Sequence, residues 1–143
     1  MNATPEALYR LRVAQGFLGE ARQDVGLGRW RAAMDDSQLS VENAAKAVLA
    51  LLGPVGRTHN PAWQLRQALA EGHFAASEIE RVRALVGLAE MLGADIHIQT
   101  DYGDEIGGRT PWELFDEEDA RRALQMAEEA FSLAEHLIGG GEA

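Results

Sequence analysis

The sequence contains no cysteine, which excludes a disulfide framework, a thiolate metal site and a cysteine nucleophile. Long apolar runs are also missing, since the longest uninterrupted one covers residues 47–52 and is far too short to span a bilayer. Residues 1–6 are polar and acidic, without the basic segment and apolar run of a signal peptide. These absences together predict a soluble, cytoplasmic protein that does not span a membrane.

The common signatures of nucleotide and hydrolase sites are missing as well. The chain has no G-x-x-x-x-G-K-[ST] loop, no G-x-G-x-x-G after a strand and no G-x-S-x-G elbow. Its four histidines form no H-E-x-x-H pattern. The glycines between Gly103 and Gly108 are interrupted by acidic residues, an unfavourable setting for a phosphate. We therefore predict neither an intrinsic metal site nor a cofactor.

Positive charge is scarce in the last third of the chain. The formal net charge is −10, and residues 95–143 carry all of it, with thirteen acids against three arginines. Nucleic-acid binding relies on basic side chains that neutralise phosphates. Direct binding of nucleic acid through this acidic third is therefore not expected, although good solubility is by itself a sufficient reason for such a charge.

Lysine is almost absent, because Lys46 is the only one and the other twelve basic residues are arginines. Lys46 follows Glu42 by four residues, the order in which an acid and a base pair best on one helix face. On an exposed surface such a pair stabilises a protein by only about 0.3–0.5 kcal/mol. The residues alone leave two interpretations open, a plain surface ion pair or part of a binding site.

Apolar residues recur at helical spacing along most of the chain, and β-strand signals are absent. The pattern predicts long helices that begin after Thr4-Pro5, at residue 30, at Ser77 and after Asp116, and a short one over residues 61–71. Residues 94–115 read as a long, mostly irregular loop. The expected fold is all-α: an up-and-down antiparallel four-helix bundle with a short extra helix and that loop before the last helix. Residues 1–138 then form a single domain, with a flexible tail over 139–143.

Four segments in order carry a resemblance to a known family. They are an amphipathic helix containing Glu42 and Lys46, a loop with residues 58–61, and the stretches 97–103 and 110–120. This order resembles the HEPN family (higher eukaryote and prokaryote nucleotide-binding domain) in its small single-domain prokaryotic form. The resemblance covers nearly the whole chain and implies the same helical bundle.

One activity that the resemblance implies is metal-independent, toxin-like RNA cleavage. Nuclease members carry an arginine, a polar residue and, after a short spacer, a histidine. Histidine can move a proton at the ribose 2′-hydroxyl, and arginine can stabilise the charged phosphorane. Arg66-Gln67 with His73 is one formal match, but it straddles the end of the short helix rather than the last long helices. A ribonuclease using Arg66 and His73 is therefore the alternative, and an enzyme is not the main prediction.

The main prediction is a binding module. Members without the nuclease motif resemble the partners of minimal nucleotidyltransferases, as in toxin–antitoxin pairs, and the family is also associated with nucleotide binding. The resemblance implies six ligand-binding candidates: Glu42, Lys46, His59, Asp101, Tyr102 and Arg109. A lysine and an arginine can hold a phosphate, and Tyr102 or Trp112 can stack on a base.

Structural roles compete with each of these assignments. Tyr102 can be a loop anchor, Trp112 can pin the loop to the bundle, and His59 can bond Glu42 at a helix start. Many relatives carry Arg-Tyr-Pro where this chain has Arg109-Thr110-Pro111, which leaves the ligand undefined. The resemblance also implies a homodimer, for which apolar residues outside the main helical stripes offer a face: Phe17, Trp30 and Trp63.

Overall fold

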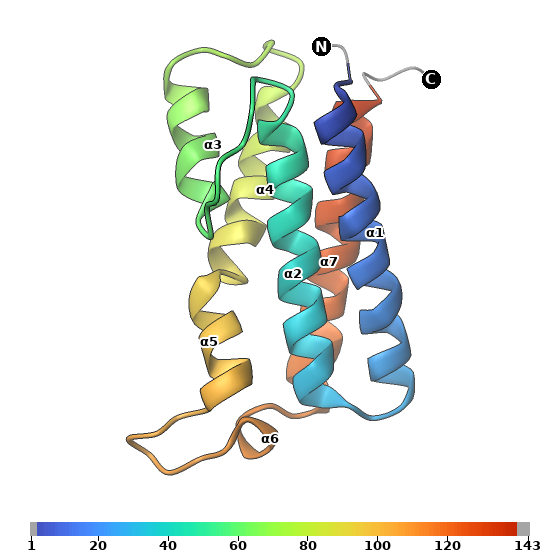
Figure 1. The fold of residues 1–143 in the computed structure, drawn as a ribbon, viewed down its shortest axis with the longest axis vertical. Helices are drawn as coiled ribbons and strands as arrows, with labels where there is room; N and C mark the ends of the chain where they lie inside the picture. The colour runs from blue at the N-terminus through green and yellow to red at the C-terminus, as the bar shows by residue number, and fades with distance from the viewer. Residues whose placement is uncertain (1–2, 140–143) are drawn as a thin grey trace.

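The computed structural model describes residues 3–139 and contains seven helices in that range (Figure 1). They are α1 (Pro5–Gly26), α2 (Trp30–Leu49), α3 (Pro61–Ala70), α4 (Ile79–Met91), α5 (Ala94–Tyr102), α6 (Pro111–Leu114) and α7 (Glu117–Ile138). Extended pairing within residues 3–139 is limited to one isolated bridge between Asp104 and Arg109. The predicted all-α fold is confirmed.

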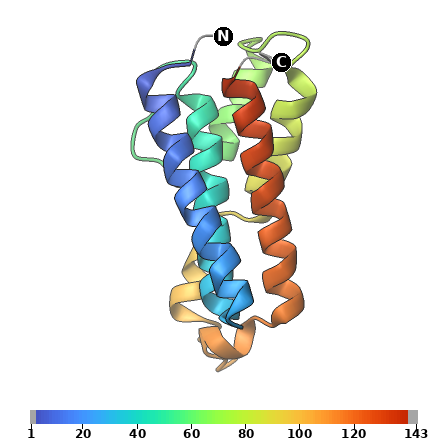
Figure 2. The same cartoon turned by 90° about the vertical axis from the view of Figure 1, so that its right-hand side faces the viewer.

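The helices run up and down in an antiparallel bundle. Helices α1, α2 and α7 contact one another, and α4 packs against α2 and α7 (Figure 1). The first turn of α1 and the last turn of α7 lie at the same end, with the two helices side by side (Figure 2). Helix α3 covers α4 and α2 near this end, and α5 extends α4 toward the opposite end. Helix α2 contacts each of the other six helices.

Polar caps explain where several helices begin. The Thr4 hydroxyl accepts the Ala7 N–H at 3.1 Å in front of Pro5, which satisfies one of the unpaired donors of the first turn. Asn60 caps α3 in the same way. Thr110 and Asp116 each form a reciprocal capping box at the start of α6 and α7. The predicted starts after Thr4-Pro5, Asn60 and Asp116 are confirmed.

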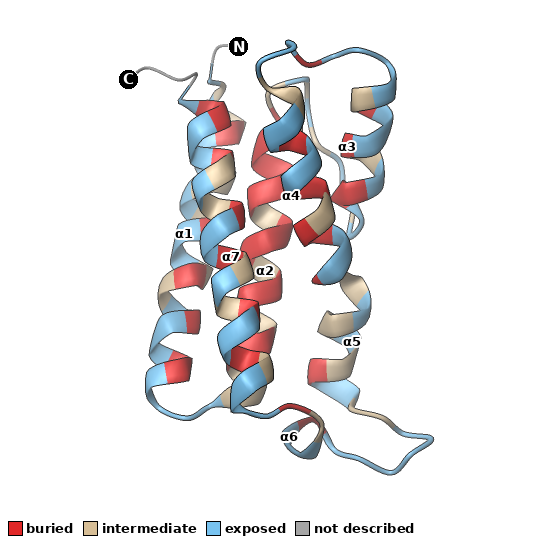
Figure 3. Ribbon diagram, turned by 180° about the vertical axis from the view of Figure 1, so that it is seen from behind, coloured by how far each residue is buried: buried red, intermediate tan, exposed pale blue. Residues whose placement is uncertain are grey.

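The core combines alanines from several helices with larger apolar residues. Helix α7 buries mainly alanines, α1 and α2 also bury several, and α4 buries mainly valines and leucines. Figure 3 shows these buried faces turned toward the inside of the bundle. Alanine on the facing sides lets the helix backbones approach closely. In the first half of α1, Ala7 and Ala14 are buried, whereas Leu8 is exposed.

The segment between α4 and α7 is more ordered than the sequence suggested. Residues 94–102 and 111–114 are helical, so the predicted irregular loop is wrong for these two stretches. Thr100 is fully buried, and its hydroxyl donates to Asp35 of α2 at 3.2 Å. The Arg31 guanidinium donates to the Thr100 carbonyl at 2.8 Å. These contacts with α2 hold α5 in place. Because they join residues far apart in the sequence, local periodicity does not predict them.

The third long helix is also shorter than predicted. Helix α4 has 13 residues, against 22, 20 and 22 for α1, α2 and α7. Its N-cap is Glu78 rather than Ser77, and the Glu78 side chain accepts no bond from the first turn of the helix. Gly93 separates α4 from α5, so two shorter helices take the place of one long helix in the bundle.

The predicted flexible tail lies largely outside the described residues, which end at Gly139. Among the described helices, none combines the length and the apolar character that crossing a bilayer requires.

Candidate functional site

Glu42 is the centre of a buried polar cluster on α2. Its carboxylate lies 3.0 Å from the Lys46 ammonium, and the two side chains are only 9% and 11% exposed. The Gln38 amide donates to the other carboxylate oxygen at 3.3 Å. Removing one charge of a buried pair destabilises a protein far more than removing one charge of a surface pair, because the remaining charge stays buried without a partner. The interpretation as an exposed surface pair therefore does not fit the structure.

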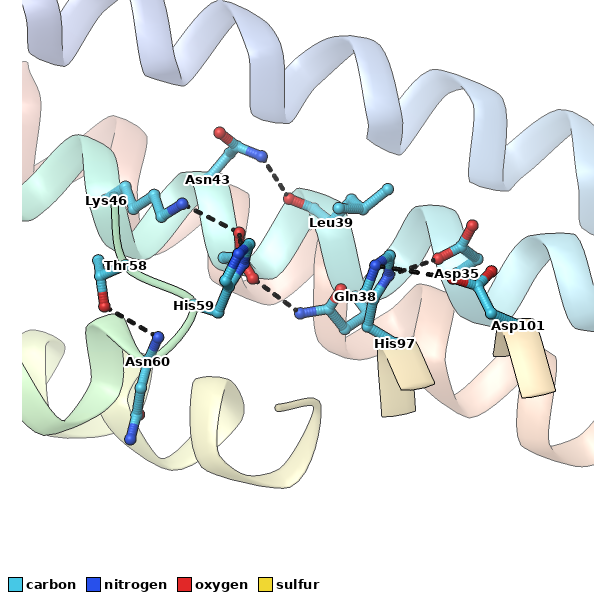
Figure 4. Close-up of polar contacts among 11 residues, drawn as sticks. Asp35, Gln38, Leu39, Asn43, Lys46, Thr58, His59, Asn60, His97 and Asp101 are labelled. Carbon is cyan, nitrogen blue, oxygen red and sulfur yellow. Dashed lines mark hydrogen bonds and ion pairs between the residues drawn. The ribbon is translucent and has the colours of Figure 1, made fainter. Parts of the chain in front are cut away.

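His59 reaches this cluster from the loop between α2 and α3. Its Nδ1 lies 3.8 Å from the Glu42 carboxylate, and its side chain is 81% exposed (Figure 4). The neighbouring Asn60 N–H donates to the Thr58 hydroxyl at 3.0 Å, which fixes the turn that carries the imidazole. The structure thus brings three of the six ligand-binding candidates together, and it also supports the contact between His59 and Glu42.

A pocket of about 330 Å³ opens beside this cluster. Side chains from α2, α3 and the junction of α4 and α5 line it, and among them are Glu42, His59, Trp63 and Arg66. Gln38, Glu42 and His59 of the polar cluster therefore line a cavity that a ligand or a partner side chain can enter, and Lys46 does not line it.

The two nuclease candidates lie in different surroundings. Arg66 forms two hydrogen bonds with the Glu90 carboxylate, and these bonds raise the pKa of Arg66 and lower that of Glu90. His73 lies 3.4 Å from the Glu71 carboxylate and borders a separate pocket of about 390 Å³. Among the hydrogen bonds of residues 3–139, none joins Arg66 to His73.

A second polar cluster joins α2 to α5, two turns before Glu42. The His97 ring lies between two carboxylates, 3.1 Å from Asp35 and 3.9 Å from Asp101 (Figure 4). Asp101 was a candidate, whereas Asp35 and His97 were not. The spacing of four between His97 and Asp101 was the available signal, and it becomes visible only if residues 94–102 are taken as a helix.

The remaining two candidates do not join either cluster. Tyr102 ends α5 with an exposed ring. Arg109 lies 3.8 Å from the Asp104 carboxylate, across the isolated bridge. The six candidates are thus divided between the pocket beside Glu42, the cluster around His97 and the turn after α5.

A group of carboxylates lies between α1 and α2. Burial raises the pKa of Asp36 to about 8, with further contributions from a hydrogen bond to Asp24 and from the charges of Asp24, Glu20 and Asp35. Asp24 is itself buried, and one of its carboxylate oxygens has no hydrogen-bond partner within residues 3–139. Asp36 therefore holds a proton at neutral pH. Within the same range, no three histidine, aspartate or glutamate side chains are arranged to hold a metal ion.

Comparisons with known proteins agree on the fold. TT1696 from Thermus thermophilus, a solved structure, is similar over 94% of this chain and 99% of that one, with a TM-score of 0.70 and 21% sequence identity. At this identity the likeness concerns the fold alone. No curated protein matches the sequence. The model of the HEPN domain matches residues 7–137, and the chain therefore belongs to the HEPN family.

Proposed function

We propose that this chain is a nucleotide-binding or partner module of the HEPN type that acts with a minimal nucleotidyltransferase and does not cleave RNA. The observation that supports the proposal is that Glu42 and His59 line one pocket, with the Glu42 carboxylate paired to Lys46. Arg66 and His73, in contrast, are each paired with a different glutamate.

The chemistry of the pocket suits recognition better than proton transfer. The Glu42 carboxylate is engaged by Lys46 on one oxygen and by Gln38 on the other, so it is held as a fixed acceptor. The His59 ring is exposed, and it therefore meets whatever enters the pocket. A volume of about 330 Å³ is near the lower end of small-molecule sites.

The charges of this pocket favour N–H donors over phosphates. Its two nearby strong cations, Lys46 and Arg66, are each already neutralised by a carboxylate. The Asp95 side chain also lines the cavity. A partner side chain or a base edge that donates hydrogen bonds fits this setting, and a phosphate would meet carboxylates without a free cation.

Co-purification tests the partner role. The tagged chain is expressed in its native cells, and co-purified proteins are identified by mass spectrometry. We expect a small nucleotidyltransferase with the unmodified chain and its loss with His59→Ala, because that ring is exposed at the mouth of the pocket.

His136→Ala is the matched control, since His136 is an exposed histidine near the end of α7. It should retain the nucleotidyltransferase. Absence of any nucleotidyltransferase with the unmodified chain, or equal recovery with His59→Ala and His136→Ala, would contradict the partner role of this pocket.

A further inference from the structure

A third pocket lies where α2 begins. It has a volume of about 490 Å³ and is lined by Gly28, Arg29, Trp30, Arg31, Ala32 and Trp112. Trp112 belongs to α6, which contacts α2 at this end of the bundle (Figure 1). The Trp112 ring is 73% exposed, and Trp30 is half-buried. Two large aromatic rings and two guanidinium groups therefore border one cavity.

The guanidinium of Arg31 is held in place without a carboxylate. It donates to the Thr100 carbonyl at 2.8 Å and lies over the Trp112 ring, 5.6 Å from its centre. These contacts orient the group and leave its positive charge uncompensated. Arg29 makes no ion pair and no side-chain hydrogen bond within residues 3–139. No carboxylate lines the cavity.

Within residues 3–139, Arg29 and Arg31 share the lack of a carboxylate partner with Arg12, Arg57 and Arg81, but only Arg29 and Arg31 lie together at this pocket. The net charge is −10, and most of the other basic side chains in the described range are paired with carboxylates: Arg10, Arg22, Lys46, Arg66, Arg83, Arg109, Arg121 and Arg122. Two unpaired arginines at one pocket thus create a local site for an anion on an acidic protein. The charge of the site is opposite in sign to the net charge of the chain.

The aromatic lining narrows the choice of anion. An exposed tryptophan ring stacks well on a planar base, and base stacking on aromatic side chains is favourable for every base. Guanidinium groups bind phosphate oxygens in a forked geometry. The volume lies within the range of small-molecule sites. A ligand that carries both a planar ring and a phosphate offers partners to Trp112, Arg29 and Arg31 together.

We propose that this pocket binds a mononucleotide, with the base against Trp112 and the phosphate between Arg29 and Arg31. The inference rests on the nucleotide-binding part of the proposed function and assigns it to a site away from Glu42. From residue 30 to residue 42 the axis of α2 extends by roughly 18 Å. One mononucleotide therefore does not occupy both pockets.

Tryptophan fluorescence tests this assignment. The chain has three tryptophans, and Trp63→Phe leaves only the two that line the proposed site. This variant is titrated with AMP, and separately with adenosine and with inorganic phosphate. We expect saturable quenching by AMP and at least about tenfold weaker binding of adenosine and of phosphate, since each lacks one half of the recognised group.

Substitutions in the Trp63→Phe background locate the ligand. Arg29→Gln and Arg31→Gln should each weaken AMP binding by about tenfold or more. Arg83→Gln is the control, because Arg83 is exposed and paired with Glu80 away from the pocket, and it should leave binding unchanged. Circular dichroism checks the fold of Arg31→Gln. Arg29 makes no side-chain contact that folding requires, so its variant decides the case if Arg31→Gln unfolds.

Four results would overturn the proposal. Equal AMP binding by Arg29→Gln and by the Trp63→Phe parent would show that Arg29 does not contact the phosphate. Binding of inorganic phosphate as tight as that of AMP would show that the site binds anions without recognising the base. Loss of AMP binding in Glu42→Gln, together with its retention in Arg29→Gln, would assign the nucleotide to the pocket beside Glu42. The proposed function would then still hold. Absence of AMP binding to the parent would refute nucleotide binding here, and the partner role would still be judged by co-purification.

Discussion

Among single residues, Glu42 and Lys46 are a pair in which the stability of the fold depends on both charges being present. Both side chains are almost fully buried, so removing one leaves the other as an uncompensated buried charge. We expect Lys46→Met and Glu42→Gln each to lower the free energy of unfolding by about 3–5 kcal/mol. The double variant should lose clearly less than the sum of the two, because it leaves neither charge alone.

Urea denaturation of the four proteins measures this cycle. Glu80→Gln is a suitable control, because Glu80 pairs with Arg83 on the surface and should change stability by less than about 0.5 kcal/mol. Strictly additive losses at Glu42 and Lys46 would show that the two charges are independent.

Asp36 makes stability depend on pH. Its pKa is raised from 3.8 to about 8 in the folded chain, so between these values the folded state binds a proton that the unfolded state has released. This contribution to the free energy of unfolding is fully present below about pH 4 and is lost as the pH rises through about 8. The melting temperature should therefore fall more steeply toward pH 8 in the parent than in Asp36→Asn, which cannot ionise.

Thermal unfolding followed by circular dichroism over this pH range checks the difference. Glu80→Gln, a surface carboxyl substitution, should keep the slope of the parent. Parallel curves for the parent and Asp36→Asn would mean that the proton on Asp36 does not stabilise the fold.

At the scale of elements, the end of α5 depends on one glycine. Gly103 has φ +70°, and a Cβ atom built there would meet the Arg109 carbonyl and the backbone of residues 110–111. Gly108 has a similar φ of +72° but open space around it. Gly103→Ala should therefore lower the free energy of unfolding by about 2 kcal/mol or more, and Gly108→Ala by about 1 kcal/mol.

Chemical denaturation measures both alanine variants. Gly108→Ala reports the cost of the strained dihedral angle alone, and Gly103→Ala reports the same strain together with a steric clash. If both variants lost the same stability, the close approach between Gly103 and residues 109–111 would carry no energetic weight.

The elements also show which parts of the fold a sequence can predict. Helices α1, α3 and α7 start where a cap residue stands before proline or an acidic turn, and such signals are local. Helix α5 has no side-chain cap and a weak apolar pattern, and the buried Thr100 and its bonds to α2 stabilise it instead. Contacts of this kind join residues about 65–70 positions apart and leave no periodic trace in the sequence.

The candidate site likewise has features that local spacing predicts and features that depend on distant contacts. Glu42 and Lys46 were predictable because a helical spacing of four already places them on one face. Their burial was not, since it depends on how α3 and α4 pack against α2. Asp35 and His97 were missed because they meet only when α5 folds onto α2.

At the scale of the whole molecule, the two nuclease candidates do not form one centre. Arg66 and His73 border different pockets and are paired with different glutamates. The acidic C-terminal third also repels RNA. We expect the purified protein to leave RNA intact in the presence of EDTA, with Arg66→Ala and His73→Ala indistinguishable from the parent in a gel-based cleavage assay.

Cleavage by the parent that disappears in both variants would make Arg66 and His73 catalytic and would refute the proposed binding role. Equal, low cleavage by all three proteins would point to a contaminant and would leave the proposal in place.

The attachment of α5 and α6 has a further consequence for how the molecule opens. Within residues 3–139 these two helices contact α2 and each other, whereas α1, α2, α4 and α7 hold together without them. We therefore expect the segment to open before the bundle unfolds, so that its amide protons exchange with solvent without global unfolding. The Trp112 ring reaches Arg31 only when this unit is closed. A ligand bound between them consequently adds its binding free energy to closure and slows exchange across residues 94–115.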